Sequence, residues 1–140
     1  MRGNFHVRFL GEEEGGISLK IREFSQKTGL TTYTLRYYEK IGLLQPERDT
    51  ANHRDYNEND LDWIDLLQKL KSTGMPLKDI REFSNLVLTG DNTIPQRIKI
   101  LEKHQEKVIE QLTEFNDCLD KVNFKIKYYR GVLKSNIREA

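Results

Sequence analysis

Apolar residues recur at helical spacing along most of this chain, and the sharpest pattern lies in its last third. After Pro95 the apolar positions are separated alternately by three and four residues, with Gln105 as the one polar member. The positions are Ile98, Leu101, Gln105, Val108, Leu112, Phe115, Leu119, Val122, Ile126, Tyr129 and Leu133. This uninterrupted heptad seam predicts a coiled-coil helix from Pro95 to Leu133, about 58 Å long at about 1.5 Å per residue.

The length of this helix requires a partner. A helix of this length is too long to bury its whole apolar seam against a domain of about 70 residues. The simplest partner is the same helix of a second copy, so the sequence predicts a homodimer. Gln105 is expected to help fix the register, as buried polar residues do in other coiled coils.

Ahead of the first proline, the sequence has the pattern of two short amphipathic helices joined by a glycine turn. The first helix is expected over residues 21–28, followed by Gly29, where a positive φ favours glycine. Thr31 or Thr32 is expected to cap the second helix. The second helix ends at Gly42, and its inner face carries Leu35, Tyr38 and Ile41. A glycine turn between short helices is typical of helix-turn-helix pairs.

The outer face of the second helix carries hydrogen-bond donors and two cations. Tyr33, Arg36, Tyr37 and Lys40 lie on this side, and Thr32 lies at its start. Such a face can present donors and positive charge to a DNA groove. Arg36 and Lys40 alone are equally consistent with an ordinary solvated face, since exposed cations are common on helices. Three tyrosines on one short helix are more than a core needs, which favours hydroxyl groups that contact phosphate.

Residues 46–56 lack periodicity and have the composition of an exposed loop or tight hairpin. Beside a helix-turn-helix, this segment is a candidate wing whose tip contacts phosphates or the minor groove. The candidate contacts are Asn52, His53 and Arg54. Asp49 and Asp55 lower the local positive charge, so Arg54 by itself does not distinguish a DNA contact from an ordinary surface residue.

Two further helices are expected after this loop. Asn57 opens the first, with Asp60 three residues later in an arrangement like a capping box, and Gly74 ends it. Its apolar positions are Leu61, Trp63, Ile64, Leu66, Leu67 and Leu70. The second follows Pro76, whose missing N–H is tolerated at a helix start. It carries Leu77, Ile80, Phe83 and Val87, and residues 89–92 break it.

The first 18 residues differ from the rest of the chain. Phe5, Val7 and Phe9 alternate with polar residues, which predicts a short strand, and residues 11–16 form an acidic spacer, GEEEGG. Glycine and glutamate codons are purine-rich, so this spacer has the composition of a translated ribosome-binding site. We hypothesise that residues 1–18 are an extension that is not native; an ordinary N-terminal arm is the alternative. A natural start near Leu19 requires a TTG or CTG codon there.

Composition and charge exclude several function classes. The formal net charge is only +1, so a DNA-binding surface has to be local, with the acidic residues elsewhere. No apolar run is long enough to span a bilayer and no secretory pattern is present, so a cytoplasmic protein without a membrane partner is expected. No catalytic constellation and no phosphate-binding loop is found, so neither an enzyme nor a cofactor is expected.

Metal binding is not expected either. The three histidines, His6, His53 and His104, are far apart, and Cys118 is the one cysteine. A disulfide within the chain is therefore excluded. Cys118 lies between acidic neighbours, whereas a sensor thiol needs nearby cations, so we interpret it as a small apolar residue beside the seam.

Three stretches of the chain carry a family resemblance. They are KIREFSQKTGLTTYTLRYYEKIGLLQP (Lys20 to Pro46), RDYNENDLDWI (Arg54 to Ile64) and LKSTGMPLKDIREF (Leu70 to Phe83). These stretches resemble the MerR family of bacterial transcription regulators, and the element TLRYYEKIGLL is highly specific to that family. The motifs cover residues 20–88, and the long terminal helix matches by architecture.

The resemblance implies a mainly α fold. A winged helix-turn-helix DNA-binding domain is expected over residues 19–90, followed over residues 91–140 by a dimerisation helix that forms an antiparallel coiled coil. The expected dimer seam is Leu101, Val108, Leu112, Phe115, Leu119, Val122, Ile126 and Tyr129. The expected DNA contacts are Thr32, Tyr33, Arg36, Tyr37, Lys40, Asn52, His53, Arg54 and Tyr56, of which Tyr56 also anchors the wing.

The resemblance also implies a mechanism. Members bind double-stranded DNA as homodimers, at a pseudo-palindrome in a promoter whose spacer is overlong. They bend and untwist the spacer so that RNA polymerase can engage both promoter elements. The expected partners of this chain are therefore promoter DNA, a second copy of itself and RNA polymerase.

Sensor features of known subgroups are missing from this sequence. Metal-sensing members carry several cysteines around the dimer helix, and stress-sensing members carry one in the helix after the wing, where this chain has Lys69. The inducing signal, the promoter and the direction of regulation stay open. Two alternatives are a coiled-coil protein-interaction module, which the near-neutral charge favours slightly, and an excisionase-like architectural factor, which the long seam disfavours.

Overall fold

The computed structural model describes residues 16–139, which form two compact units divided after Leu101. The strand expected around Phe5 to Phe9 lies outside the described residues. No helix in the described part of the chain is both long and apolar enough to cross a membrane. The elements are α2 (Ile21–Thr28), α3 (Thr32–Lys40), β1 (Glu47–Arg48), β2 (Arg54–Asp55), α4 (Glu58–Ser72), α5 (Leu77–Thr89), η1 (Asp91–Thr93) and α6 (Ile94–Glu139).

α2 and α3 form a helix-turn-helix because local caps end the first helix and begin the second. Gly29 adopts the left-handed conformation, with φ 75°, and its N–H donates to the Ser25 carbonyl over 2.9 Å. The Thr31 side-chain oxygen accepts a hydrogen bond from the Thr34 N–H over 3.1 Å. The predicted turn is confirmed, and of the two candidate caps Thr31 is the one that is used.

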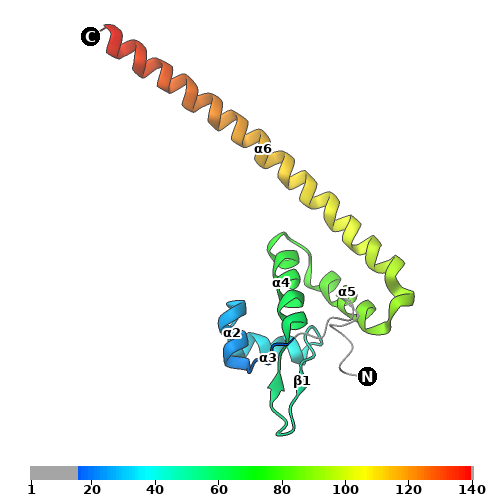
Figure 1. Cartoon of the computed structure of the whole chain (residues 1–140). Coiled ribbons are helices and arrows are strands. Elements are labelled where there is room, and N and C mark those ends of the chain that lie inside the picture. Colours follow the sequence, from blue (N-terminus) through cyan, green and yellow to red (C-terminus); the bar gives the residue numbers. More distant parts are fainter. Residues whose placement is uncertain (1–15, 140) are drawn as a thin grey trace. The chain divides into compact units, whose positions relative to one another are not determined.

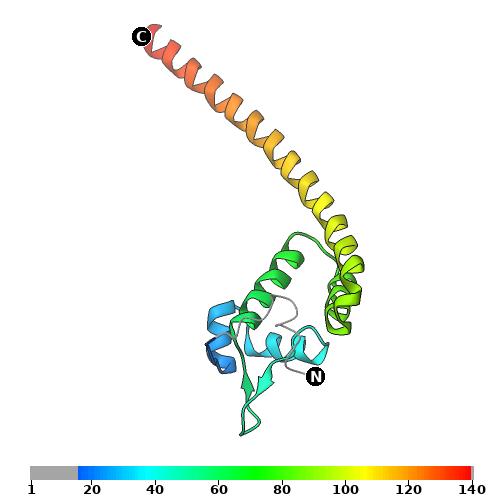
Figure 2. The same cartoon turned by 45° about the vertical axis from the view of Figure 1, so that its right-hand side comes forward.

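β1 and β2 form a short antiparallel hairpin, in which Glu47 pairs with Asp55 and Arg48 with Arg54. The hairpin projects from the helices in both Figure 1 and Figure 2. At its base the backbones of Leu19 and Tyr56 exchange two N–H···O bonds of 2.8 Å. The segment that precedes α2 therefore lies beside the end of the hairpin.

α4 and α5 supply a large part of the core that supports these elements. The capping box predicted for α4 is confirmed: the Asn57 side chain accepts from the Asp60 N–H over 3.0 Å, and the Asp60 carboxylate accepts from the Asn57 N–H over 2.9 Å. Trp63 is fully buried, and its indole N–H donates to the Leu43 carbonyl over 2.6 Å. The most deeply buried apolar side chains are Phe24, Leu35, Leu44, Tyr56, Trp63, Ile64, Phe83 and Val87.

The break predicted after α5 is a single turn of 3-10 helix. Gly90 ends α5 with φ 123°, a conformation that favours glycine. Arg97 then reaches back, and its guanidinium donates to the Gly90 carbonyl over 2.5 Å and to Thr93 Oγ1 over 3.0 Å. The Gly90 carbonyl also accepts a hydrogen bond from the Thr93 N–H, so the buried arginine adds a second connection between the break and the start of α6.

α6 is longer than the sequence predicts. It has 46 residues, which corresponds to about 69 Å, and it ends at Glu139 instead of Leu133. No proline and no glycine follows Leu133, so nothing in the last residues stops the helix. The helix begins at Ile94, which places Pro95 in the first turn, where its missing N–H is tolerated.

Candidate DNA interface

α3 divides its side chains sharply between solvent and core. Tyr33 and Tyr37 are 79% and 45% exposed, and Arg36 is exposed beside them. Leu35 and Tyr38 are buried on the opposite side, as the 3.6-residue period requires. Lys40 extends the exposed row, whereas Thr32, at the start of the helix, is half-buried. The outer face of α3 therefore presents the predicted combination of hydroxyl groups and cations.

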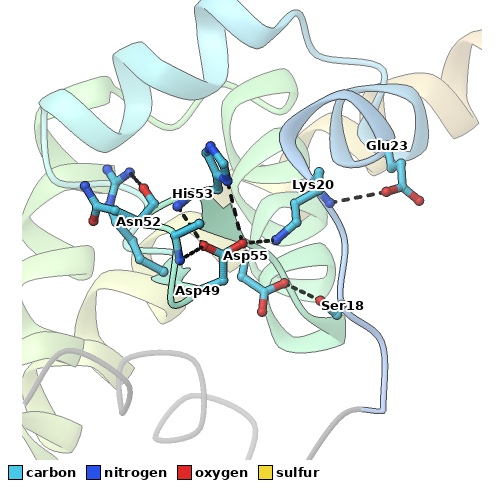
Figure 3. Close-up of polar contacts among 9 residues, drawn as sticks. Ser18, Lys20, Glu23, Asp49, Asn52, His53 and Asp55 are labelled. Carbon is cyan, nitrogen blue, oxygen red and sulfur yellow. Dashed lines mark hydrogen bonds and ion pairs between the residues drawn. The ribbon is translucent and has the colours of Figure 1, made fainter.

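The tip of the wing is a tight turn that Asp49 organises, as Figure 3 shows. Asp49 Oδ1 accepts hydrogen bonds from the backbone N–H groups of Ala51 and His53, both over 2.9 Å. Asn52 between them has φ 64°, a left-handed conformation that asparagine tolerates better than most residues. Asn52 and His53 are both exposed, so the turn presents two of the predicted contacts at its tip.

Lys20, the residue before α2, holds the same carboxylate from the other side. Its Nζ donates to Asp49 Oδ2 over 2.6 Å, and Ser18 Oγ donates to Asp55 Oδ1 over 2.5 Å (Figure 3). The hydrogen bond from Lys20, helped by the N–H of His53, lowers the pKa of the Asp49 carboxyl to about 2. The same hydrogen bond raises the pKa of the Lys20 amine. Both groups are therefore charged at neutral pH.

Glu39 connects α3 to both strands of the wing. Its Oε1 accepts a hydrogen bond from Arg48 over 2.9 Å, and its Oε2 accepts a short one from Nε of Arg54. Arg54 is thus turned toward α3, with 26% of its side chain exposed. The structure shows Arg54 bound to a residue of the protein itself. A direct contact between Arg54 and DNA therefore stays a prediction.

Tyr56 corrects one prediction, because it does not lie on the surface of the interface. Its side chain is fully buried, and burial raises the pKa of its hydroxyl to about 12. The ring is stacked on Phe24 of α2. A ring without exposed surface cannot contact DNA, so of its two expected roles only that of wing anchor fits this position.

Sequence reasoning missed the residues that hold the interface together, namely Lys20, Glu39 and Asp49. Glu39 is 9 and 15 residues away from its two arginines, and Lys20 is 29 residues away from Asp49. Helical spacing rules connect residues three and four apart, so they do not reach these pairs. Opposite charge was the one available signal, and it does not select partners among 23 basic and 22 acidic residues.

The seam of α6 is largely exposed in the single chain. The exposed seam residues are Leu101, Leu112, Phe115, Leu119, Val122, Ile126 and Tyr129, and Val108 is half-buried. Cys118, next to the seam residue Leu119, is exposed as well. Among the described residues, no group of three His, Cys, Asp or Glu side chains is placed to hold a metal ion.

Charge is segregated along the same helix. Residues 102–120 contain six acidic side chains and two lysines. Residues 121–138 contain six basic side chains and no acidic one. The two halves of this surface therefore have opposite net charge, which bears on how a second helix can pair with it.

Two short helices with a glycine turn, a hairpin beside them and supporting helices define a winged helix-turn-helix protein. The model of the family described as "MerR HTH family regulatory protein" matches residues 19–86 of this chain. An uncharacterized HTH-type transcriptional regulator of Haemophilus influenzae is 40% identical over 107 residues, which are 76% of this chain and 79% of the relative. The chain belongs to the MerR family of helix-turn-helix transcription regulators.

Further similarities extend over most of the chain. The uncharacterized HTH-type transcriptional regulator YyaN of Bacillus subtilis is 37% identical over 130 residues, which are 84% of this chain and 94% of the relative. Among solved structures, HiNmlR is similar with a TM-score of 0.71 and 36% identity, over 81% of this chain and 91% of that chain. HiNmlR is described as a MerR family regulator lacking the sensor domain, bound to promoter DNA. The predicted family and fold class are thereby confirmed.

Proposed function

We propose that this regulator binds promoter DNA as a homodimer, with α3 in the major groove and the wing tip on the adjacent backbone or minor groove. The observation that carries the proposal is the exposed row on α3, in which Tyr33, Arg36, Tyr37 and Lys40 face solvent beside a wing tip held in place by hydrogen bonds. Hydroxyl groups and cations on such a helix suit phosphate and base-edge contacts.

Further support for DNA binding comes from the distribution of charge. The net charge of +1 does not announce a nucleic-acid partner. Among the described residues, however, Arg36 and Lys40 on α3 form no ion pair, so their charges are available to phosphate. Where the proposed groove contact lies, the outer face of α3 therefore carries two cations without an acidic partner in the described part of the chain.

Support for the homodimer comes from α6, whose apolar seam is exposed in the single chain. An antiparallel partner places the acidic residues 102–120 of one copy beside the basic residues 121–138 of the other. A parallel partner places like charges side by side over the whole length, which is unfavourable. The same helix thus offers a self-complementary surface in the antiparallel orientation only.

The regulatory step that we propose is deformation of the promoter. Two copies of α3 on a symmetric dimer read two half-sites, so the target is a pseudo-palindrome. Backbone contacts from both wings can offset the free-energy cost of bending and untwisting the spacer between the promoter elements. RNA polymerase in the cytoplasm would then engage both elements.

The experiment that tests this function is a titration of the purified protein with the intergenic DNA upstream of its own gene, at several salt concentrations. Tight, sequence-dependent binding that weakens steeply with salt is expected, since phosphate contacts release counterions. Sequence-independent binding at every salt concentration contradicts the proposal.

A second candidate function is a coiled-coil module whose helix-turn-helix packs against a protein. The near-neutral net charge favours it. This function predicts a DNA affinity that hardly depends on salt, so the same titration distinguishes the two.

A further inference from the structure

Glu39 is the one acidic residue of α3, and it differs from the acidic residues of the wing because two arginines from different strands share its carboxylate. Arg48 lies on β1 and Arg54 on β2, and these two residues pair directly across the hairpin. Each arginine uses a different oxygen of Glu39. One carboxylate therefore links α3, β1 and β2.

The link continues to the tip of the wing. Besides its bond to Glu39, Arg48 donates from Nη1 to the backbone carbonyl of Asn52 over 3.2 Å. Asn52 is the residue with the left-handed backbone conformation at the tip. The tip is thus tied to α3 through Arg48, and it is tied to the start of α2 through the Lys20–Asp49 pair in Figure 3.

The hairpin itself is too short to hold this position. Each strand has two residues, and an isolated two-stranded hairpin is marginally stable in water. The ion pairs of Glu39 are partly exposed, with 23% to 35% of each side chain accessible. Such pairs contribute little to the free energy of unfolding, so their main effect is on geometry.

Glu39 also controls the charge of the wing. A free guanidinium binds phosphate whatever the base sequence, which strengthens binding to all DNA and lowers discrimination. Arg48 and Arg54 are each engaged by Glu39, in contrast to Arg36 on the outer face of α3.

We propose that Glu39 is a positioning residue for DNA recognition, which holds the wing at a fixed place relative to α3 and withholds two wing arginines from unselective phosphate binding. A wing fixed in advance loses less conformational entropy when both elements sit on the operator. This inference rests on the proposed function, because it presupposes that α3 and the wing bind DNA together.

The test compares Glu39→Gln with Glu47→Gln. Glu47 is an exposed residue of β1, so its substitution changes the net charge equally without touching the two arginines. Affinity is measured by fluorescence anisotropy for the upstream intergenic DNA and for an unrelated duplex of the same length. We expect Glu39→Gln to lower the ratio of these affinities about tenfold, or about 1.4 kcal/mol, and Glu47→Gln to leave it within about twofold of wild type.

Equal ratios for the two variants overturn the inference when the wild type discriminates between the duplexes. A wild type that binds both duplexes equally well contradicts the proposed function instead.

Hydrogen exchange of the wing amides in the free protein then tests, without DNA, whether Glu39 fixes the position of the wing. Glu39→Gln is expected to speed exchange at Asn52 and His53, and unchanged exchange overturns the inference. Glu39→Asp, too short to reach both arginines, serves as the second variant if Glu39→Gln fails to fold.

Discussion

The ring of Tyr56 lies flat against the ring of Phe24, with centroids 4.1 Å apart and an angle of 11° between the planes. Both side chains are fully buried. The backbone of Tyr56 forms an antiparallel bridge with Leu19, in the segment that precedes α2. Tyr56 directly follows the second strand of the wing, and Phe24 belongs to α2. The wing is therefore rooted in the core of the helix-turn-helix by an aromatic stack.

This stack predicts unequal effects of two substitutions at Tyr56. Tyr56→Ala leaves a cavity against Phe24 and is expected to cost about 3 kcal/mol of unfolding free energy or more. Tyr56→Phe keeps the ring and is expected to stay within about 1 kcal/mol of wild type, because the buried hydroxyl finds no partner among the described residues. Urea unfolding, followed by the fluorescence of the buried Trp63 at one fixed protein concentration, measures both.

The matched control is Tyr33→Ala. This ring is 79% exposed, so its removal is expected to change the unfolding free energy by less than about 0.5 kcal/mol. A loss for Tyr56→Ala no larger than that of the control contradicts the anchoring role.

The Lys20–Asp49 pair predicts a specific response to acid. The pKa of Asp49 falls from 3.8 to about 2 on folding, so its ion pair stabilises the folded state fully above pH 4. This contribution is lost as the pH falls from about 4 toward about 2, when the carboxyl becomes protonated. Asp49→Asn lacks the titrating group, so its unfolding free energy is expected to depend less on pH across this window.

Asp62→Asn is the control for that experiment, because Asp62 is an exposed carboxyl of α4. Unfolding curves at several pH values between 2 and 5 are compared with wild type for both variants. If the unfolding free energy of Asp49→Asn depends on pH as steeply as that of wild type, the assignment of the low pKa to Asp49 is contradicted.

The exposed row on α3 predicts that Arg36→Ala weakens operator binding more than about tenfold, since a direct contact from arginine to DNA contributes about 1–3 kcal/mol. The side chain is exposed and forms no ion pair with another described residue, so the thermal unfolding midpoint is expected to stay unchanged. Arg81→Ala removes another exposed arginine, from α5, and is expected to leave operator affinity close to wild type. Unchanged affinity of Arg36→Ala at physiological salt contradicts the role.

Local sequence rules predicted much of the scaffold. The turn at Gly29 and the capping box of Asn57 and Asp60 depend on residues within a few positions of one another, so their chemistry is visible in the sequence. The division of α3 into an outer face with Tyr33 and an inner face with Tyr38 follows from the helical period alone. These features place the outer face of α3 in the predicted interface.

The same rules could not predict how the wing is held. The bonds of Glu39 to Arg48 and Arg54 depend on a hairpin register that a two-residue strand hardly encodes. Tyr56 looks like a surface tyrosine beside a loop, and its burial becomes visible only when α2 places Phe24 against it. Charge and polarity mark candidate residues in a loop, but tertiary packing decides which of them remain exposed.

The charge segregation of α6 predicts the orientation of the dimer. In a Cys118→Ser background, one sample carries a donor dye at Lys103→Cys and another carries an acceptor at Lys134→Cys. These sites are about 47 Å apart along one helix at about 1.5 Å per residue, but they lie near each other in an antiparallel pair. Strong energy transfer is therefore expected after the two samples are mixed. In a control mixture, donor and acceptor are both attached at Lys134→Cys, and weak transfer is expected.

Two further substitutions connect this result to the seam. Leu119→Lys places a charge in the apolar seam and is expected to abolish transfer by dissociating the dimer into chains of 16.5 kDa. Phe124→Lys adds the same charge at an exposed position outside the seam and is expected to preserve transfer. Strong transfer between two copies labelled at Lys134→Cys indicates a parallel pair. That outcome contradicts the antiparallel arrangement, because like charges would then face each other from residue 121 to residue 138.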